Sequence, residues 1–263
     1  MERTGIATNE PLTAGFLAEL VAELDRAEVA GIILGGSHAR GNATALSDVD
    51  IALLVRETAQ VRPRDYFYGE GRLVSVTTKS LAGIRADMDK PQIAVRLVPG
   101  LSEAVVLLDK DGSVDALMRD LAAFSWAPLQ ENANRCVSEI MLHVTEPAQK
   151  LANELLKGNA PGVAYATGQM LSALTEVIIV HYGIMVESDS TYYRRAEEAV
   201  GADSEWAKYH RRAAGLTSAR LEGRARACLH LHRLTLKLVR HVMSKEHAAV
   251  AEEAAHRVEF LYT

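Results

Sequence analysis

Gly35-Gly-Ser-His-Ala-Arg-Gly-Asn-Ala-Thr-Ala-Leu-Ser-Asp-Val-Asp-Ile51 is a polar stretch between two short apolar runs, Val29 to Leu34 and Ile51 to Val55. Apolar runs of this length and composition predict two buried strands, which the polar stretch links. Binding and catalytic residues are disproportionately carried by loops that a rigid scaffold positions. A functional site is therefore expected in this loop.

The start of the stretch has the composition of an anion-binding turn. Gly35 and Gly36 allow the backbone to turn sharply and to approach a ligand closely. Ser37 is expected to be the N-cap of a short helix through Ala39 and Arg40. Backbone N–H groups and the positive end of the helix dipole would then face a phosphate. Gly36 and Ser37 are predicted to bind that phosphate, while Arg40 either reaches it or forms a surface ion pair.

The end of the stretch carries two carboxylates at the start of a strand. Asp48 and Asp50 are two residues apart, so both side chains leave the same face, about 7 Å apart along the strand. Mg²⁺ is commonly held by one or two carboxylates, with water and substrate phosphates as the other ligands. Asp48 and Asp50 are therefore the predicted metal ligands and catalytic residues.

The order Gly36, Ser37, Gly41, Asp48 and Asp50 resembles the signature of the polymerase-beta-like nucleotidyltransferase superfamily. The resemblance implies transfer of a nucleoside monophosphate from a nucleoside triphosphate to a hydroxyl or phosphate, with release of pyrophosphate. Taken separately, the two halves of the pattern would indicate only a glycine-rich turn and two solvated aspartates. Their order and their position between two strands favour the functional interpretation.

The strand that follows departs from the family pattern. Residues 73 to 78 alternate as a strand, with Ser75 and Thr77 on one face. The superfamily usually places a third metal-site carboxylate on this strand, where the sequence has no acidic residue. Sequence alone does not place the other acidic candidates, which are Asp65, Glu70 and Glu103. The missing carboxylate puts a second metal site in question.

The whole chain has 263 residues, 48% of them hydrophobic, and a net charge of -5. Its length allows one large domain or two ordinary ones. No long run of Lys and Arg stands out, which argues against a long nucleic-acid substrate and favours a small acceptor. No apolar segment of about 20 residues and no basic leader are evident, so a cytoplasmic protein without a membrane segment is expected. Cys136 and Cys228 lack disulfide or metal-ligand spacing.

The pattern of elements changes near residues 125 to 131, so two domains are expected, residues 1–127 and 128–263. The first is predicted to be an α/β (α+β) domain, a small mixed sheet flanked by helices, and the second an all-α helical bundle. Residues 56 to 71 are expected to form a loop whose aromatic cluster, Tyr66 to Tyr68, either stacks on a base or anchors the loop to the core. The other expected elements are helices at 11–26, 81–89 (ended by Pro91), 114–124, 132–157, 162–182, 190–200, 204–214, 217–244 and to about 261, and a strand at 104–108.

A helical bundle behind such a domain resembles the kanamycin (aminoglycoside) nucleotidyltransferases. Those enzymes carry a glutamate general base and a lysine four residues later at the start of their helical domain, and Glu146 and Lys150 match that spacing. Residues at i and i+4 share a helix face, so the carboxylate can take a hydroxyl proton while the ammonium binds a phosphate oxygen. An ordinary ion pair is the alternative, and Pro147 is expected to disturb the helix. Rival bases are Glu139, Glu154 and Glu176.

A looser pattern in the bundle, Arg226 to His232 or Arg224 to His230, resembles the Arg-x-x-x-x-x-His motif of the HEPN ribonucleases. A segment this rich in Arg and His also produces such spacings by chance. His230 and His232 are two residues apart on a helix and point in different directions, which argues against a metal pair.

Together these observations predict a Mg²⁺-dependent nucleotidyltransferase that moves AMP from ATP to a hydroxyl of a small molecule, such as an aminoglycoside-like antibiotic. By resemblance, the protein is expected to be a homodimer. Two alternatives stay open. One is a nucleotide-binding regulatory protein with weakened catalysis, and the other is a toxin–antitoxin type of nucleotidyltransferase that modifies a protein or a tRNA end.

Overall fold

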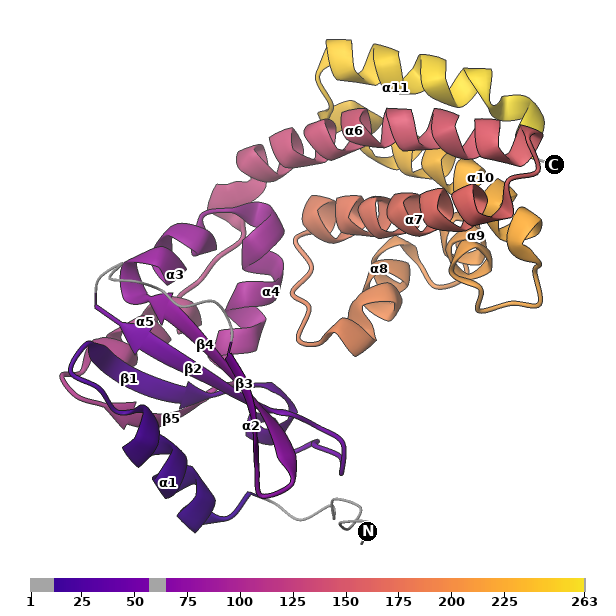
Figure 1. Ribbon diagram of the computed structural model, residues 1–263. Coiled ribbons are helices and arrows are strands. Elements are labelled where there is room, and N and C mark those ends of the chain that lie inside the picture. Colours follow the sequence, from indigo (N-terminus) through magenta and orange to yellow (C-terminus); the bar gives the residue numbers. More distant parts are fainter. Residues whose placement is uncertain (1–11, 57–64, 263) are drawn as a thin grey trace, which may run out of the picture. The chain divides into compact units, whose positions relative to one another are not determined.

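The computed structural model describes residues 12–56 and 65–262. The chain divides into two compact units, Met1–Ser125 and Trp126–Thr263, which are described separately below (Figure 1). The first unit contains a small mixed sheet with helices, and the second is mostly helical, so the predicted fold class is confirmed.

The sheet unit is built on five strands in the order β3-β4-β2-β1-β5. Strands β2 and β4 are parallel, and the other neighbouring pairs are antiparallel. Every residue of β1 is buried, as its apolar sequence predicts. The strand bounds are β1 Val29–Leu34, β2 Val49–Val55, β3 Asp65–Gly69, β4 Arg72–Ser80 and β5 Val105–Asp109.

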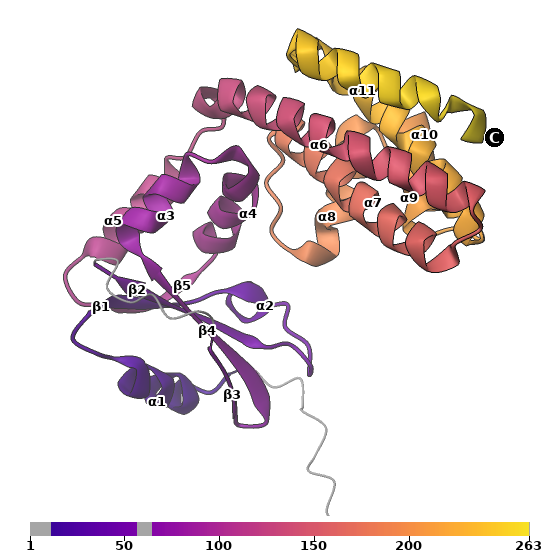
Figure 2. The same cartoon turned by 45° about the horizontal axis from the view of Figure 1, so that its top comes forward.

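Helices cover both faces of this sheet (Figures 1 and 2). Helix α1 (Ala14–Leu24) begins after Thr13, whose side chain accepts a hydrogen bond from the N–H of Phe16. Its apolar stripe packs with the inward side chains of β1, β2 and β4 into one core. The opposite face of the sheet carries α3 (Leu81–Met88), α4 (Pro91–Ser102) and α5 (Ser113–Ala122).

Part of the segment predicted as a loop is an edge strand. Residues 65–69 form β3, paired antiparallel with β4, whereas residues 57–64 lie outside the described part of the chain. Phe67 packs against the core on the α1 side, while Tyr66 and Tyr68 are 57% and 77% exposed. The cluster is therefore divided by the alternation of the strand, with one aromatic ring inward and two outward.

Helix α4 was not predicted, because Pro91 was taken as the end of the preceding helix. Pro91 is instead the first residue of α4, after α3 has ended at Met88. Proline suits the first helical position, since its fixed φ is helical and its missing N–H would have no partner there in any case. The prediction was wrong about what this proline does, and α4 forms one wall of the candidate site.

The second unit is a bundle of helices in which α7 is central. The helices are α6 Gln130–Leu156, α7 Ala160–Tyr182, α8 Tyr192–Val200, α9 Glu205–Ala214, α10 Leu221–Val239 and α11 Lys245–Arg257. Helix α6 continues through Pro147, which corrects the expected disturbance at that residue. Extensive packing of α6 against α7, α10 and α11 stabilises the helix across the proline.

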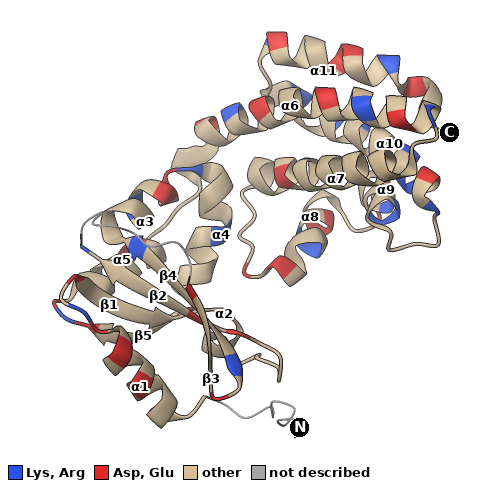
Figure 3. Ribbon diagram, in the orientation of Figure 1, with Lys and Arg blue, Asp and Glu red and all other residues tan. Residues whose placement is uncertain are grey.

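In the described part of the chain, α7 is the one helix long and apolar enough to cross a membrane by length and composition. Its ribbon carries a single acidic residue and no lysine or arginine (Figure 3). In the most apolar 18-residue segment of this helix, 61% of the residues are buried inside the structure. The central helix of a soluble bundle meets the same criteria, so this feature is weak support for a membrane segment.

Candidate functional site

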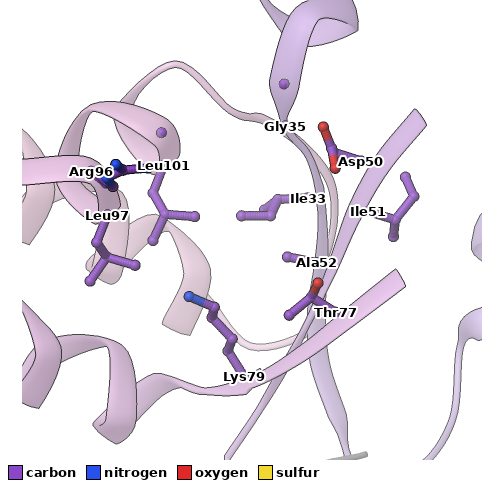
Figure 4. A pocket seen from close by; sticks show the side chains of 12 residues that line it. Ile33, Gly35, Asp50, Ile51, Ala52, Thr77, Lys79, Arg96, Leu97 and Leu101 are labelled. Atoms are coloured by element: carbon purple, nitrogen blue, oxygen red, sulfur yellow. The ribbon is translucent and has the colours of Figure 1, made fainter. Parts of the chain in front are cut away.

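A cavity of about 220 Å³ opens beside the glycine-rich loop in the sheet unit (Figure 4). Strands β1, β2 and β4 form one wall, and α4 forms the other. Its polar lining combines the loop backbone with one carboxylate, one hydroxyl and two cations. The lining residues are Ile33, Gly35, Gly36, Asp50, Ile51, Ala52, Thr77, Lys79, Arg96, Leu97, Gly100 and Leu101.

The glycine-rich loop packs against Asp50 and is hydrogen-bonded to it. The N–H of Gly35 donates to the carbonyl oxygen of Asp50 at 2.8 Å. Gly36 has a φ of +66°, and a Cβ at this position would lie 2.2 Å from Asp50 Oδ2. Glycine is therefore required at residue 36 both for the left-handed backbone and for the position of the Asp50 carboxylate. The close approach seen here is to the Asp50 carboxylate, and approach of this backbone to a phosphate stays a prediction.

The short helix α2 (Gly36–Ala39) begins two residues earlier than predicted. Its N-cap is Gly35, in extended conformation, and not Ser37. Ser37 lies inside the helix, because Gly36 itself adopts the turn conformation that starts it. Arg40 lies 3.9 Å from the Glu103 carboxylate. Neither Ser37 nor Arg40 is among the described residues that line the cavity.

Asp50 is within β2, and Asp48 directly precedes that strand. Both carboxylates lie close enough to His38 to favour its charged form. The described residues contain no group of three or more His, Cys, Asp and Glu side chains placed to hold a metal. The space beside Asp50 at Gly36 is open only because residue 36 has no Cβ. Two carboxylates in this position still suit one divalent cation, because water and substrate phosphates can complete its oxygen ligands.

Ser75 occupies the position where a third carboxylate would be expected. It is paired with Asp50 in the parallel register of β2 and β4, it is 1% exposed, and its Oγ has no hydrogen-bond partner in the described part of the chain. Asp65 is paired with Val76, whose side chain belongs to the core beneath α1. Because paired residues share a face, Asp65 points away from Asp50 and is excluded as the third ligand.

Two cations in the cavity were not recognised from the sequence. Lys79 is two residues after Thr77 on β4, so both face the cavity, and Figure 4 shows the lysine side chain extending towards α4. The alternation could have identified it, but the strand was predicted to end at Thr78. Arg96 lies on α4, which was not predicted at all.

His38, inside the motif, was also given no role from the sequence. Burial lowers its pKa, and the charge of Arg72 lowers it further, against the raising effects of a hydrogen bond with the Ser47 backbone and of Asp48 and Asp50. Its Nε2 is buried and has no hydrogen-bond partner among the described residues. The ring is therefore a neutral group beside the two carboxylates that are predicted to bind the metal.

The predicted base and its neighbour belong to the helical unit. Glu146 and Lys150 are both exposed on α6, and neither lines the cavity of the sheet unit. Of the rival bases, Glu154 accepts hydrogen bonds from Asn159 and Lys157, which lower its pKa. Glu139 is exposed, and Glu176 is half-buried on α7.

The ribonuclease-like spacing does not produce a shared site. His232 is fully buried, and burial lowers its pKa to about 4. Arg226 instead donates to Glu222 and to the Leu261 carbonyl, while Arg224 donates to the Ala213 carbonyl. A histidine that is sealed from solvent cannot exchange protons with a bound substrate, so the Arg226 and His232 pair has no catalytic geometry.

Comparisons with known proteins support the superfamily for the first unit. Residues 17–104 match the model of the nucleotidyltransferase domain family. A solved structure described as a nucleotidyltransferase-like protein, from Exiguobacterium sibiricum 255-15, is similar with a TM-score of 0.53 and 16% identity over 85% of this chain and 74% of the other. At that identity the similarity shows the fold alone. No curated protein matches the chain. Nucleotidyl transfer is thus the supported class of reaction, and domains of this family generally use divalent metal ions.

Proposed function

We propose that the protein is a Mg²⁺-dependent nucleotidyltransferase that moves AMP from ATP to a hydroxyl of a small molecule. The observation that carries the proposal is the contact of Gly36 with Asp50, which joins a phosphate-approaching backbone to a metal-binding carboxylate at the edge of one cavity. Lys79 and Arg96 line the same cavity and supply the positive charge that a triphosphate requires.

Each part of the cavity has a role in this proposal. Asp48 and Asp50 would hold Mg²⁺, which when bound neutralises phosphate charge and favours the ionised form of the attacking hydroxyl. The Gly36 backbone would approach the phosphates, and Lys79 and Arg96 would neutralise the charge that develops on the pyrophosphate. Most of the catalysis would then be positioning and electrostatic stabilisation.

The acceptor side of the proposal depends on both units. Glu146 would take the acceptor proton and Lys150 would bind a phosphate oxygen, in a cytoplasmic homodimer that modifies an aminoglycoside-like molecule. In the sheet unit, Tyr66 is paired with Ser75, which in turn is paired with Asp50, so the exposed tyrosine lies on the same face as the carboxylate. Such a ring can stack on a nucleotide base or on the acceptor.

Incubation with ATP labelled at the α-phosphate, Mg²⁺ and a panel of aminoglycosides and lincosamides tests the proposal. Label on a small molecule, with release of pyrophosphate, is the expected result. It should disappear in Asp50→Asn and persist in Asp65→Asn, a matched change on the opposite face of the sheet. Label on a protein or a tRNA end would favour the toxin–antitoxin type of enzyme instead.

A second candidate is a regulatory protein that binds the nucleotide without turnover. Ser75 favours it, because this residue leaves the cation with one carboxylate fewer than the family usually provides. Tight ATP binding in calorimetry, with no product from any acceptor or from added polynucleotide and protein, would identify this function. Product formation at ordinary enzyme rates of around 10 per second would rule it out.

A further inference from the structure

The helical unit contains its own cavity, of about 430 Å³, between α9, α10 and a C-terminal turn that begins with Glu259–Leu261. This volume is typical of small-molecule sites. Arginines of α9 and α10, two of the helices with basic residues coloured blue in Figure 3, contribute to its wall. Its polar and aromatic lining includes Tyr209, Arg212, Arg226, His230, Arg233 and Tyr262. Nucleotidyl transfer as proposed above uses none of these residues.

Two of the arginines have carboxylate partners at the surface. Arg226 donates to Glu222 at 2.9 Å and to the Leu261 carbonyl at 3.2 Å. Arg233 lies 3.5 Å from Glu259, the one carboxylate in the lining. The two glutamates are 67% and 54% exposed, and ion pairs this exposed contribute little to stability. An anionic ligand can therefore replace them at small cost.

The third arginine carries a charge that the described residues do not neutralise. Arg212 is exposed on α9 and has no ion pair or hydrogen bond within residues 12–56 and 65–262. Its Nη2 lies 3.3 Å from the position of a Cβ on Gly223, so the guanidinium sits beside the first turn of α10. Arg212 thus directs positive charge to the cavity at the junction of the two helices.

His230 adds a buried donor to this group. Arg233 Nη2 lies 3.3 Å from His230 Nε2, and a guanidinium only donates, so Nε2 is the acceptor. Burial and the charge of Arg233 lower the pKa of His230, while Glu205, 3.7 Å away, raises it. In the neutral ring the proton is on Nδ1. That atom is buried, on a residue 8% exposed, and has no partner in the described part of the chain.

Preformed aromatic surfaces complete the cavity. The rings of Tyr209 and His230 are stacked, 4.0 Å between centroids and 3° from parallel. The Tyr262 hydroxyl donates to the Ala255 carbonyl at 2.8 Å, and the Arg233 guanidinium lies 5.2 Å from the centre of that ring. Because these contacts hold the rings in place without a ligand, little ordering is needed on binding.

We propose that this cavity binds a small phosphate monoester, with the three arginines and the Nδ1–H of His230 around the phosphate and the tyrosine rings against the organic group. The described polar groups are mostly donors, and a phosphate offers three terminal oxygens that match the arginine fork. The cavity is larger than an inorganic phosphate, and its aromatic walls provide an apolar surface for the rest of the ligand.

Calorimetric titration of the full-length protein with phenyl phosphate, inorganic phosphate and phenol tests the site. Phenyl phosphate should bind more tightly than inorganic phosphate, and phenol should not bind. Arg212→Ala should weaken phenyl phosphate binding about tenfold, since a hydrogen bond to a charged group is lost. Two controls should leave it unchanged. Arg194→Ala removes an exposed arginine of α8, and Arg96→Ala changes the cavity of the sheet unit.

His230→Phe separates the donor from the stacking surface. Phenylalanine keeps a ring beside Tyr209 but removes the Nδ1–H, so binding should weaken while the thermal unfolding temperature stays close to that of the parent protein. If His230→Phe does not fold, the titration of Arg212→Ala with phenyl phosphate tests the proposal by itself. Absence of phenyl phosphate binding at millimolar concentration, equal losses in Arg212→Ala and Arg96→Ala, or equal binding of inorganic and phenyl phosphate would overturn the proposal.

Discussion

The cavity of the sheet unit and the cavity of the helical unit described above obtain their charged groups in different ways. In the sheet unit, the loop backbone and Asp50 come from one contiguous stretch, and Gly36 and Asp50 lie in contact. In the helical unit, Arg212, Arg226 and Tyr262 come from two helices and a C-terminal turn. The first is a carboxylate site with one cation, Lys79, on the wall formed by the strands and another, Arg96, on the helical wall, whereas the second is dominated by arginine. A site built from one loop can be recognised in a sequence, and a site assembled from helix faces cannot.

The largest expected effect is on the carboxylate site. Asp50→Asn removes a negative ligand without changing the size of the side chain, so Mg²⁺ should no longer bind with ATP. Loss of several kcal/mol of transition-state stabilisation predicts a fall in turnover of at least about a thousandfold. Steady-state kinetics and calorimetry with and without Mg²⁺ measure this. Phenyl phosphate binding in the helical unit should be unaffected. Loss of both turnover and phenyl phosphate binding would contradict the separation of the two sites.

The next effect concerns the acid stability of the helical unit. His232 is fully buried and its pKa is lowered to about 4, so between about pH 6.5 and pH 4 the unfolded chain binds a proton that the folded chain does not. Stability is complete above that range and is lost as the pH falls through it, by about 3 kcal/mol for this group. Denaturant unfolding at pH 7 and pH 4.5 measures the difference.

Tryptophan fluorescence restricts that measurement to one unit, because both tryptophans of the chain, Trp126 and Trp206, belong to the helical unit. His232→Leu should reduce the pH dependence. His256→Leu is the control, since His256 is 78% exposed on α11. Equal pH dependence in the parent protein and in His232→Leu would show that another group causes the acid sensitivity.

A glycine pair tests the contact at the centre of the sheet site. Gly36→Ala places a Cβ against the Asp50 carboxylate and displaces it, so turnover should fall roughly a hundredfold, the effect of a shift of about 1 Å in an active site. Gly41→Ala is the matched control. Gly41 has a φ of +70°, but a Cβ there would meet nothing within 4 Å. Backbone strain is common to both variants, so similar losses of activity would assign the effect to strain and not to the carboxylate.

The smallest expected effect is a gain. Ser75→Asp places a carboxylate in register with Asp50 and should tighten Mg²⁺ binding by about tenfold, because affinity for hard cations increases with the number of charged ligands. Ser75→Asn controls for size. Titration of Mg²⁺ at fixed ATP provides the measurement. If both variants bind Mg²⁺ as the parent protein does, the position of Ser75 is not part of the metal site.

Much of the sheet unit was predictable because its elements are decided locally. The run from Val29 to Leu34 is buried over its whole length and forms β1 with the predicted bounds. The alternation around Ser75 was also sufficient to identify β4 and the missing carboxylate. The strand, however, extends to Ser80, and the added residues bring Lys79 into the cavity. Strand ends depend on pairing with neighbours, which a single sequence does not contain.

Other features required information that is not local. Ser37 is a good N-cap by type, yet Gly35 takes that position because contact with Asp50 requires the left-handed backbone at Gly36. Pro91 ends a helix or begins one equally well from its chemistry, and tertiary packing decides which. The arginines of the helical cavity are spread over α9 and α10, so no spacing in the sequence brings them together.

The position of β1 inside the sheet, between β2 and β5, has a consequence for synthesis of the chain on the ribosome. One edge of β1 pairs with β2, close in sequence, but the other pairs with β5, which begins only at Val105. A nascent chain that has not yet reached β5 therefore exposes an open apolar strand edge, which readily pairs with other chains. Because long-range pairing is slow, we expect the polypeptide to be most prone to aggregation during this interval.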